Sequence, residues 1–360
     1  MKVVGFGDFL IHFSPIMGER FAQSKLVEMS FTGAEANVCC ALGNWGESTE
    51  FVTKLPDNIL AKSGVSFLKS LSVNTEHIPY GDGRMGTYYL EKGHGIRPSV
   101  VVYDRAHSVF CESCFHDYPW EDILKDASCL YVSGITPALS DTLFDCVLHA
   151  VKAAREKNIL VFFDVNYRAK LLSIEKAAHI FHALSPYITH LIGNEEHLKG
   201  ILGIQTTFGE DRVKERLEEV TKAVSERTKI PHIAVTVRRT LSADHTAFCA
   251  SYFDGKALEI SPKYDLYPLD RVGSGDAFSA GLIYSHIKGY GAKESVSFAA
   301  ASCAMKHEIA NDINFASTEE IRSVMESKGY MPYRQCSRHW WCGSCSSGRR
   351  MLTDLRQCAG

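Results

Sequence analysis

Two glycines and an aspartate lie within one short turn, Gly273-Ser274-Gly275-Asp276, and an apolar helical pattern begins directly after it. Glycine lets the backbone turn sharply, so the turn is expected to present successive N–H groups at a helix start, where the helix dipole favours an anion. Asp276 has two interpretations: it caps the helix, or it takes a proton from an alcohol as a phosphate group arrives. A second carboxylate, Asp270, precedes the turn and favours the second interpretation over simple phosphate storage.

Other signs of chemistry in the sequence are weak or missing. The chain has no Gly-x-x-x-x-Gly-Lys-Ser/Thr loop and no His-Glu-x-x-His motif, and Gly5-Phe6-Gly7 lacks the third glycine of a dinucleotide fingerprint. The twelve cysteines include two pairs with ligand-like spacing, Cys111 with Cys114 and Cys342 with Cys345. Because these pairs lie far apart in the sequence, a zinc site is the weaker interpretation of their spacing.

The strands and helices that position the turn can be predicted from the spacing of apolar residues along the chain. Short β-branched runs alternate with longer amphipathic stretches, which predicts an α/β fold with a mainly parallel sheet covered by helices. The expected strands are Val3–Phe6, Cys129–Val132, Ile159–Phe163, Ile188–Ile192 and His232–Val237. The expected helices are Gly33–Trp45, Leu139–Glu156, Ile174–Leu184, Asp211–Thr228, Gly275–Lys288 and Ala292–Glu308.

Two segments, 9–31 and 86–110, carry alternating runs instead and predict a small antiparallel sheet. This sheet would be a flap over the edge of the site or an extension of the main sheet. From about Tyr333 the chain loses both periods and concentrates Cys, Ser and Arg. We therefore assign the domain to residues 1–332 and treat 333–360 as an irregular tail, either a genuine appendix or the product of cloning or of a shifted reading frame.

The composition and charge of the chain limit the kinds of binding partner that we expect. The 360 residues are 45% hydrophobic and 22% charged, with a formal net charge of -3, which is typical of a soluble globular protein. This balance gives no electrostatic reason to expect nucleic acid or an anionic membrane as a partner. No run of about 18 apolar residues occurs, and the start is too short in apolar residues for a secretory signal. We therefore expect a cytoplasmic protein.

At the glycine-rich turn the sequence resembles the ribokinase-like, or PfkB, carbohydrate kinases. Their C-terminal pattern, Asp-Thr-x-Gly-x-Gly-Asp-x-Phe-x-x-Gly, matches residues 270–281 everywhere except at Arg271, which replaces Thr. Phe31–Val38 is similar to the N-terminal Gly-Gly-Ala-x-x-Asn-Val-Ala pattern, with Thr32 in place of the first Gly. Three further segments resemble those of 2-keto-3-deoxygluconate kinases: Asp164–Arg168, Val132–Leu139 and Tyr103–Arg105.

The resemblance implies a ribokinase-like three-layer α/β/α sandwich with a mainly parallel central sheet and a small β-sheet lid built from about residues 9–31 and 86–110. It implies an ATP-dependent sugar kinase that uses Mg²⁺ and phosphorylates the terminal hydroxyl of a keto-deoxy sugar acid, 2-keto-3-deoxygluconate above others. It also allows a monovalent cation near the turn. The predicted flap itself is a candidate surface for a homo-oligomer, since the edge strands of an exposed flap invite pairing. The alternatives are a fructokinase, a ribokinase or another sugar kinase of the family, and a catalytically silent sugar-binding regulator.

The resemblance also assigns roles to residues. Asp276 would be the base, and the amides of Gly273, Ser274 and Gly275 would stabilise the phosphate. The sugar would contact Asp8, Gly33, Asn37, Tyr89, Tyr103, Arg105, Arg168 and Asp312. The nucleotide would contact Asn166, Asn194, Thr236, Arg238, Gly273, Gly275 and Ala300. Arg105 and Arg168 could each grip a substrate carboxylate with two parallel hydrogen bonds, and surface salt bridges are the alternative.

Two family motifs are altered in this chain. The Asn-x-x-Glu motif near phosphate and magnesium is Asn194-Glu195-Glu196-His197 here. Either Glu195 or Glu196 supplies the carboxylate, or Mg²⁺ is held mainly through waters and ATP oxygens. The Thr-x-Gly-x-x-Gly pattern of the nucleotide strand is Thr236-Val237-Arg238-Arg239-Thr240 here, without its glycines.

Overall fold

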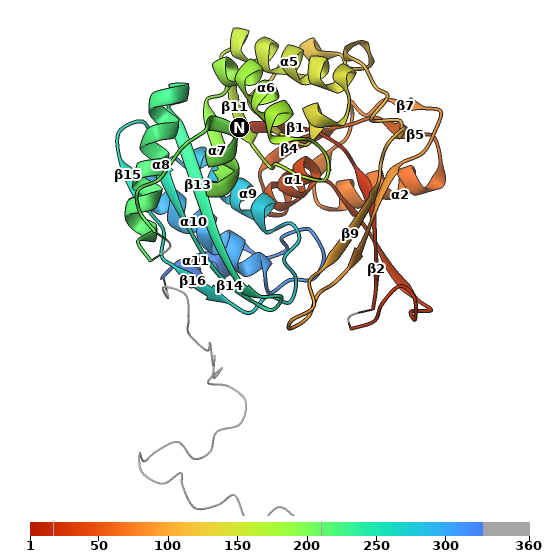
Figure 1. Ribbon diagram of the computed structural model, residues 1–360. Helices are drawn as coiled ribbons and strands as arrows, with labels where there is room; N and C mark the ends of the chain where they lie inside the picture. The colour runs from red at the N-terminus through yellow and green to blue at the C-terminus, as the bar shows by residue number, and fades with distance from the viewer. Residues whose placement is uncertain (17, 210, 327–360) are drawn as a thin grey trace, which may run out of the picture. The chain divides into compact units, whose positions relative to one another are not determined.

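The computed structural model describes residues 1–16, 18–209 and 211–326, and its main feature is a sheet with helices on both faces (Figure 1). Within these residues the sheet has ten strands: β1 (Lys2–Phe6), β4 (Ser48–Val52), β6 (Val73–Asn74), β10 (Ala127–Ser133), β11 (Leu160–Asp164), β12 (His190–Asn194), β13 (His232–Ser242), β14 (His245–Phe253), β15 (Leu258–Ile260) and β16 (Tyr264–Leu266). Their order is β15-β14-β13-β12-β11-β10-β1-β4-β6, with β16 paired to β14. The strands from β6 across to β13 run parallel, whereas β14 pairs antiparallel with each of its neighbours.

Alternating apolar residues explain why helices cover both faces of this sheet. On β10, Leu130 and Val132 belong to one core, and Cys129 and Tyr131 belong to another. Successive residues of a strand point to opposite faces, so both faces of β10 are buried.

The two cores are covered by different helices. The first core is covered by α3 (Trp120–Ile123), α5 (Asp141–Glu156), α6 (Ile174–Leu184), α7 (Glu195–Leu202) and α8 (Val213–Thr228). The second is covered by α1 (Ala34–Asn44), α9 (Ser274–Ile287), α10 (Ala292–Lys306) and α11 (Thr318–Glu326). Figure 1 shows α5 and α6 on the opposite side of the sheet from α9 and α10. The predicted α/β/α layers and mainly parallel sheet are therefore confirmed.

A second, separate sheet contains the two segments that were expected to form a lid. Its strands are β2 (Leu10–Pro15), β3 (Val27–Thr32), β8 (Gly86–Glu91) and β9 (Val100–Asp104), in the order β3-β2-β8-β9. The pairs β2/β3 and β8/β9 are antiparallel, but the central pair β2/β8 is parallel. The prediction of an antiparallel sheet is thus wrong for the central pair. Residues 16–85 separate β2 from β8, so a crossover and not a hairpin joins them, and a crossover suits parallel strands.

The remaining elements are short or lie beside this lid sheet. They are α2 (Ile59–Ser70), α4 (Thr136–Leu139), the paired strands β5 (Leu55–Pro56) and β7 (Tyr80–Gly81), and two 3-10 helices at Phe115–Asp117 and Ser185–Tyr187. In the part of the chain that the structure describes, no helix is both long enough and apolar enough to span a membrane.

The expected tail, residues 333–360, lies outside the described residues together with Cys342 and Cys345, so the predicted domain boundary stays a prediction. Cys111 and Cys114 are free thiols. Among the residues described, no three His, Cys, Asp or Glu side chains are grouped so that they could hold a metal ion.

Candidate active site

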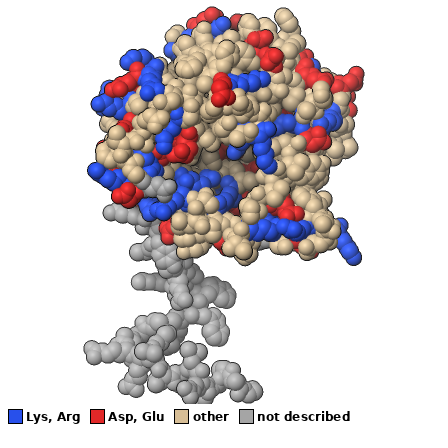
Figure 2. Space-filling model, in the orientation of Figure 1, with Lys and Arg blue, Asp and Glu red and all other residues tan. Residues whose placement is uncertain are grey.

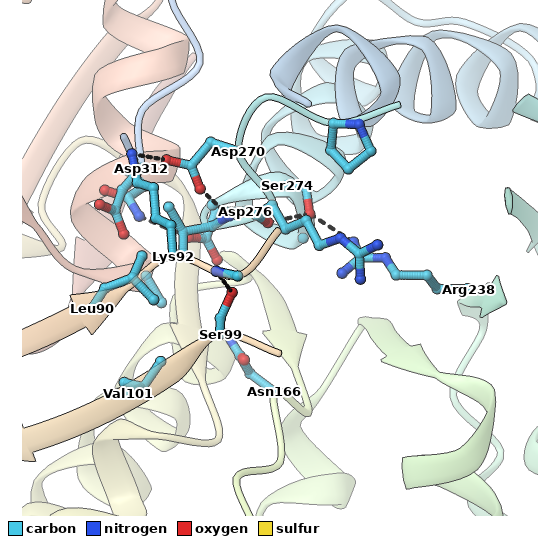
Figure 3. Close-up of a pocket in the computed structure, with 18 of the residues that line it drawn as sticks. Leu90, Lys92, Ser99, Val101, Asn166, Arg238, Asp270, Ser274, Asp276 and Asp312 are labelled. Atoms are coloured by element: carbon cyan, nitrogen blue, oxygen red, sulfur yellow. Dashed lines mark hydrogen bonds and ion pairs between the residues drawn. The ribbon is translucent and has the colours of Figure 1, made fainter. Parts of the chain in front are cut away.

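A cavity of 1310 Å³ lies between the lid sheet and the carboxyl ends of the parallel strands (Figure 3). The lid sheet contributes Leu10, Tyr88, Leu90, Val101 and Tyr103. On the other side, Asp164 and Asn194 end β11 and β12, Asn166 follows β11, and Thr236 lies within β13 beside Asn194. Figure 2 shows a hollow on this face with Lys and Arg side chains beside it. The charged residues that line the cavity are Lys92, Arg105, Arg168, Arg238 and Arg271, with Asp8, Glu35, Asp164, Asp244, Asp270, Asp276 and Asp312. The position beyond the strand ends is where open α/β sheets bind ligands, and the lining suits a charged one.

The glycine-rich turn starts α9 at one side of this cavity. Gly273 has a φ of +71°, and a Cβ there would lie 1.7 Å from the carbonyl oxygen of Asp312, so only glycine fits. A Cβ on Gly275 would meet nothing within 4 Å, which leaves open space in front of the turn. Arg238 donates a 2.6 Å hydrogen bond from Nη2 to Ser274 Oγ, so a guanidinium group lies at the helix start. Open space, a helix N-terminus and a guanidinium group together suit a phosphate.

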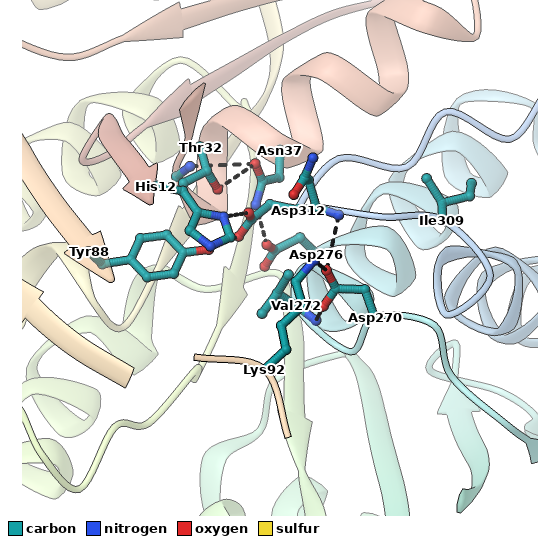
Figure 4. A network of polar contacts seen from close by, with 12 residues as sticks. His12, Thr32, Asn37, Tyr88, Lys92, Asp270, Val272, Asp276, Ile309 and Asp312 are labelled. Atoms are coloured by element: carbon teal, nitrogen blue, oxygen red, sulfur yellow. Dashed lines mark hydrogen bonds and ion pairs between the residues drawn. The ribbon is translucent and has the colours of Figure 1, made fainter. Parts of the chain in front are cut away.

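Asp276 lies in the first turn of α9 and is buried. Its Oδ2 accepts a 2.7 Å hydrogen bond from Asn37 Nδ2 on α1, and Asn37 Oδ1 in turn accepts from Thr32 Oγ1 at 3.1 Å (Figure 4). This cross-helix bond, and not a cap on α9, fixes the carboxyl group. Burial raises the pKa of Asp276 to about 7, although the Asn37 bond opposes the shift. A carboxyl with a pKa near neutrality is well matched to accepting a proton from an alcohol.

Asp8 and Arg105 form a buried pair at the lid side of the cavity. Arg105 Nη1 lies 3.6 Å from Asp8 Oδ2, and its guanidinium carbon lies 4.2 Å from the centre of the Tyr103 ring. Burial raises the pKa of Asp8 to about 6, against the opposing effect of Arg105. A Cβ on Gly33 would lie 2.0 Å from the Asp8 carbonyl oxygen, so this glycine lets α1 begin directly against Asp8. Arg168 lines the same cavity from the exposed loop after β11, which brings both candidate arginines to one site.

Tyr88, and not Tyr89, faces the cavity from β8. Tyr88 donates a 2.6 Å hydrogen bond to Asp312 Oδ1, and His12 Nδ1 lies 2.8 Å from Asp312 Oδ2 (Figure 4). Tyr89 points to the other face of the lid sheet, where it stacks on Phe13. The sequence-based assignment of Tyr89 to the sugar is therefore not supported, because residues that follow one another on a strand face opposite ways.

The expected nucleotide residues lie along the other side of the cavity, with one exception. Asn166, which has a φ of +36°, Thr236 and Asn194 line the cavity, and Asn194 also caps α7 through a 3.0 Å hydrogen bond from the Glu196 N–H. Ala300 is fully buried in the second core and does not line the cavity, so the structure does not bring it to the site.

A family model described as pfkB family carbohydrate kinase matches residues 2–317. The chain belongs to this family. It is similar to the solved structure of a 2-dehydro-3-deoxygluconokinase from Thermotoga maritima, with 36% identity, a TM-score of 0.88 and coverage of 91% of this chain and 99% of that chain. It is similar to a PfkB family carbohydrate kinase from Listeria grayi, with 30% identity, a TM-score of 0.85 and coverage of 91% and 100%. It is also 29% identical over 328 residues to a 2-dehydro-3-deoxygalactonokinase from Haloferax volcanii, covering 90% of this chain and 96% of that protein. The ribokinase-like fold and the carbohydrate kinase assignment are confirmed.

The carboxylates that the sequence offered to Mg²⁺ are engaged elsewhere in this kinase. Glu195 is buried and accepts a 2.6 Å hydrogen bond from Arg216 Nε, and the exposed Glu196 pairs with Lys199 at 3.2 Å. Neither glutamate lines the cavity. His197 does, and burial lowers the pKa of its imidazole. The prediction of Glu195 or Glu196 as a direct ligand is therefore not supported. The remaining alternative, a hydrated Mg²⁺ held mainly by phosphate oxygens, fits the preference of this ion.

Several cavity residues were missed by sequence reasoning. Asp164, whose pKa burial raises to about 6, stands two positions before Asn166 and could have been found from the same motif. Tyr88 could have been found by following the alternation of β8. Lys92 had no signal, because it reaches the site from the irregular segment between β8 and β9 and pairs with Asp270 at 2.8 Å.

Proposed function

We propose that this carbohydrate kinase transfers the γ-phosphoryl group of ATP to the terminal hydroxyl of a 2-keto-3-deoxy sugar acid, with 2-keto-3-deoxygluconate as the first candidate and its 6-phosphate as the product. The observation that carries the proposal is that Arg105 and Arg168 line the same cavity as Asp276. Two guanidinium groups suit the carboxylate of a sugar acid, because arginine forms parallel, charge-assisted hydrogen bonds to such groups. Arg105 already lies beside Asp8, so a neutral sugar would leave the exposed Arg168 without the carboxylate that an acid substrate supplies.

The reaction follows from the placement of the turn and of Asp276. Asp276 accepts the proton of the terminal hydroxyl while that oxygen forms a bond to the γ-phosphorus and the bond to the leaving oxygen of ADP breaks. The N–H groups at the start of α9 and the Arg238 guanidinium stabilise the charge on the transferred phosphoryl group. Tyr88, held by Asp312, lies where it can contact the sugar. Mg²⁺, when bound with ATP, would neutralise part of the phosphate charge.

The names of similar proteins support a keto-deoxy sugar acid as the substrate. They do not decide between the gluconate and galactonate epimers. The Thermotoga maritima protein is named for the gluconate form and the Haloferax volcanii protein for the galactonate form. The second candidate substrate is accordingly 2-keto-3-deoxygalactonate. Because one fold can host many specificities, fructose and ribose are the alternatives within the family.

A panel of sugars tests the proposal. The purified protein is incubated with Mg²⁺, ATP and one of four sugars: 2-keto-3-deoxygluconate, 2-keto-3-deoxygalactonate, fructose or ribose. We expect ADP release with one or both acids and a kcat/KM at least about tenfold lower with fructose and ribose, since a lost charge-assisted pair costs about 1.5–3 kcal/mol. Faster turnover of a neutral sugar would overturn the acid assignment. No turnover of any sugar, with sugar binding retained, would favour a silent sugar-binding regulator.

We also propose that the exposed side of the lid sheet pairs two copies of the chain. β3 and β9 are its edge strands, and Val27, Met29, Val100 and Val102 are exposed on them. Unpaired strand edges with apolar side chains favour association. Light scattering of the purified protein tests this: a dimer is expected, and a monomer at micromolar concentration would contradict it.

A further inference from the structure

The loop between β8 and β9, residues 92–99, crosses from the lid sheet to the expected nucleotide side of the cavity; we call it the lid loop. The Ala243 N–H donates a 2.9 Å hydrogen bond to the carbonyl oxygen of Gly95, and His94 Nδ1 lies 3.8 Å from Asp244 Oδ2. Ala243 and Asp244 form the turn between β13 and β14, and β13 carries two of the expected nucleotide residues. The lid loop therefore joins the sugar side of the cavity to the nucleotide side.

Hydrogen bonds within the lid loop hold its backbone in one shape. His94 and Arg97 exchange two backbone hydrogen bonds of 3.0 Å, and the Gly93 N–H donates to Ser99 Oγ at 2.9 Å (Figure 3). A Cβ on Gly93 would lie 2.4 Å from the carbonyl oxygen of Arg97, so a side chain would not fit there. The loop thus presents Lys92, its first residue, from a fixed backbone position.

Lys92 places its ammonium group beside the start of the glycine-rich turn. Its Nζ lies 2.8 Å from Asp270 Oδ2, and the Lys92 side chain is only 13% exposed. Asp270 Oδ1 accepts a 3.2 Å hydrogen bond from the Val272 N–H, so this carboxylate is tied to the backbone that enters the turn (Figure 4). An ammonium group has three N–H donors. Because Asp270 is its one partner among the residues that the structure describes, the other donors are free for a ligand.

Two cations therefore flank the turn, one from each side of the cavity. Arg238 reaches Ser274 from β13, and Lys92 reaches Asp270 from the lid loop. Figure 3 shows Ser274 and Asp276 between the two cations, and the four named side chains and Asp276 all line the cavity. Positive charge on both sides of a helix N-terminus suits the several charges of a nucleotide phosphate.

The chemistry of the proposed reaction indicates which part of the substrates meets Lys92. In phosphoryl transfer, the γ-phosphoryl group lies between the attacking hydroxyl, which Asp276 would deprotonate, and the rest of the ATP. A cation that reaches the turn from the sugar side meets this group before the other phosphates. The carboxylate of a 2-keto-3-deoxy sugar acid is at the opposite end of the molecule from its terminal hydroxyl, so it would lie away from the turn and from Lys92.

We propose that Lys92 binds the γ-phosphate of ATP and stabilises the transferred phosphoryl group, which makes the lid loop a part of the phosphate site. The free donors of its ammonium group supply the contact, while Asp270 keeps the ammonium beside the turn. The inference rests on the proposed function for the transfer of phosphate from ATP, and it does not depend on which sugar is the acceptor.

Calorimetric titrations with ATP and with ADP, in the presence of Mg²⁺ and without sugar, test this role. Lys92→Met removes the charge and keeps much of the length of the side chain, whereas Lys92→Arg keeps the charge. Arg97→Met is the matched control, because Arg97 lies on the same loop and pairs with Glu91 at 3.0 Å but does not line the cavity. The melting temperature of each variant is measured beside the affinities.

Lys92→Met should bind ATP at least about tenfold more weakly and ADP within about threefold of normal, since the lost charge-assisted hydrogen bond goes to the phosphate that ADP lacks. Lys92→Arg should bind ATP at least about threefold more tightly than Lys92→Met, and Arg97→Met should bind both nucleotides within about threefold of normal. With 2-keto-3-deoxygluconate as the acceptor, Lys92→Met should also lower kcat by at least about tenfold and leave KM for the sugar within about threefold.

Equal losses of ATP and ADP affinity in Lys92→Met would mean that the lysine only holds the lid loop in place, and would overturn the proposal. Unchanged ATP affinity would overturn it as well, and so would a raised KM for the acid alone, which would assign Lys92 to the sugar. If Lys92→Met does not fold, the same titrations of Lys92→Gln, which can still donate to Asp270, decide the question. If the unaltered protein binds ATP but phosphorylates no keto-deoxy acid, the proposed substrate fails, and the nucleotide titrations still decide the role of Lys92.

Discussion

Replacing Asp276 with asparagine is expected to slow turnover by orders of magnitude and at the same time to stabilise the fold. Burial raises the pKa of this carboxyl from the ordinary 3.8 to about 7, a difference of about three pKa units. Each unit corresponds to about 1.4 kcal/mol, so the ionised group costs the folded state about 4 kcal/mol. Asparagine has the same shape, can still accept the hydrogen bond from Asn37 and carries no charge, so this cost is removed.

The sign and the pH window of the stability change follow from the direction of the shift. Because the folded pKa lies above the unfolded one, the folded state holds the proton more tightly, and stability is lost as the pH rises from about 4 to about 7. The gain in the free energy of unfolding from Asp276→Asn should therefore be about 4 kcal/mol at pH 8, which lies above both pKa values. At pH 5, which lies between the two pKa values, the gain should be only about 2 kcal/mol. Urea unfolding at both pH values measures it, with the exposed Asp141→Asn on α5 as a control that should change stability by less than about 0.5 kcal/mol.

The activity of the same variant tests the role of the carboxyl as a base. We expect kcat to fall by about 10² to 10⁴ while the calorimetric affinity for the sugar stays within about threefold of normal. Near-normal turnover would refute the assignment of Asp276 as the base. A stability gain that is equal at pH 5 and pH 8 would refute the reasoning from burial.

The pH profile of the unaltered protein gives an independent check. Asp276 accepts a proton only when it is ionised, so kcat/KM should fall about tenfold per pH unit below an apparent pKa near 7. The coupled release of ADP, followed between pH 5 and pH 9, measures the profile. An acid limb near pH 4 would mean that the reacting base is an ordinary exposed carboxylate.

Four substitutions test other assignments. Arg168→Met should raise KM for the acid substrate by about tenfold or more and leave KM for ATP unchanged, because a charge-assisted pair to the sugar is lost; equal effects on both would contradict this role. Gly273→Ala should lower stability by at least about 2 kcal/mol through its clash and positive φ, whereas Gly275→Ala should melt normally and bind ATP about tenfold more weakly, since its methyl group enters the open space. Glu195→Gln should lower the melting temperature by weakening the buried pair with Arg216 and leave the Mg²⁺ dependence of the rate unaltered; a raised Mg²⁺ requirement would restore the glutamate as a ligand.

The periodicity of the sequence located most of the layers but not every element. The helix predicted at Ile174–Leu184 has those bounds, because its apolar residues follow the helical period without interruption. β4 was not predicted, since Thr49 and Glu50 interrupt its apolar run, although both are buried. The parallel pairing of β2 with β8 could not be predicted, because alternation along a strand carries no information about which strand lies beside it or in which direction it runs.

Some features of the site could likewise be predicted from adjacent residues, whereas others depend on contacts between distant parts of the chain. The turn from Gly273 to Asp276 could be found because all its requirements lie in adjacent residues. The hydrogen bond from Asn37, and the burial that shifts the pKa of Asp276, depend on how α1 packs against α9, which no local pattern records.

The contact between His12 and Asp312 joins residues 300 positions apart in the chain. During synthesis on a ribosome the lid strands and α1 emerge early, while the glycine-rich turn and Asp312 emerge late. A nascent chain that stops before residue 312 therefore lacks one side of the cavity, whatever the state of its N-terminal half. Occupancy of the pocket by sugar then reports that both ends of the fold have met, and a ligand bound there resists the separation of the first strands from the last helices.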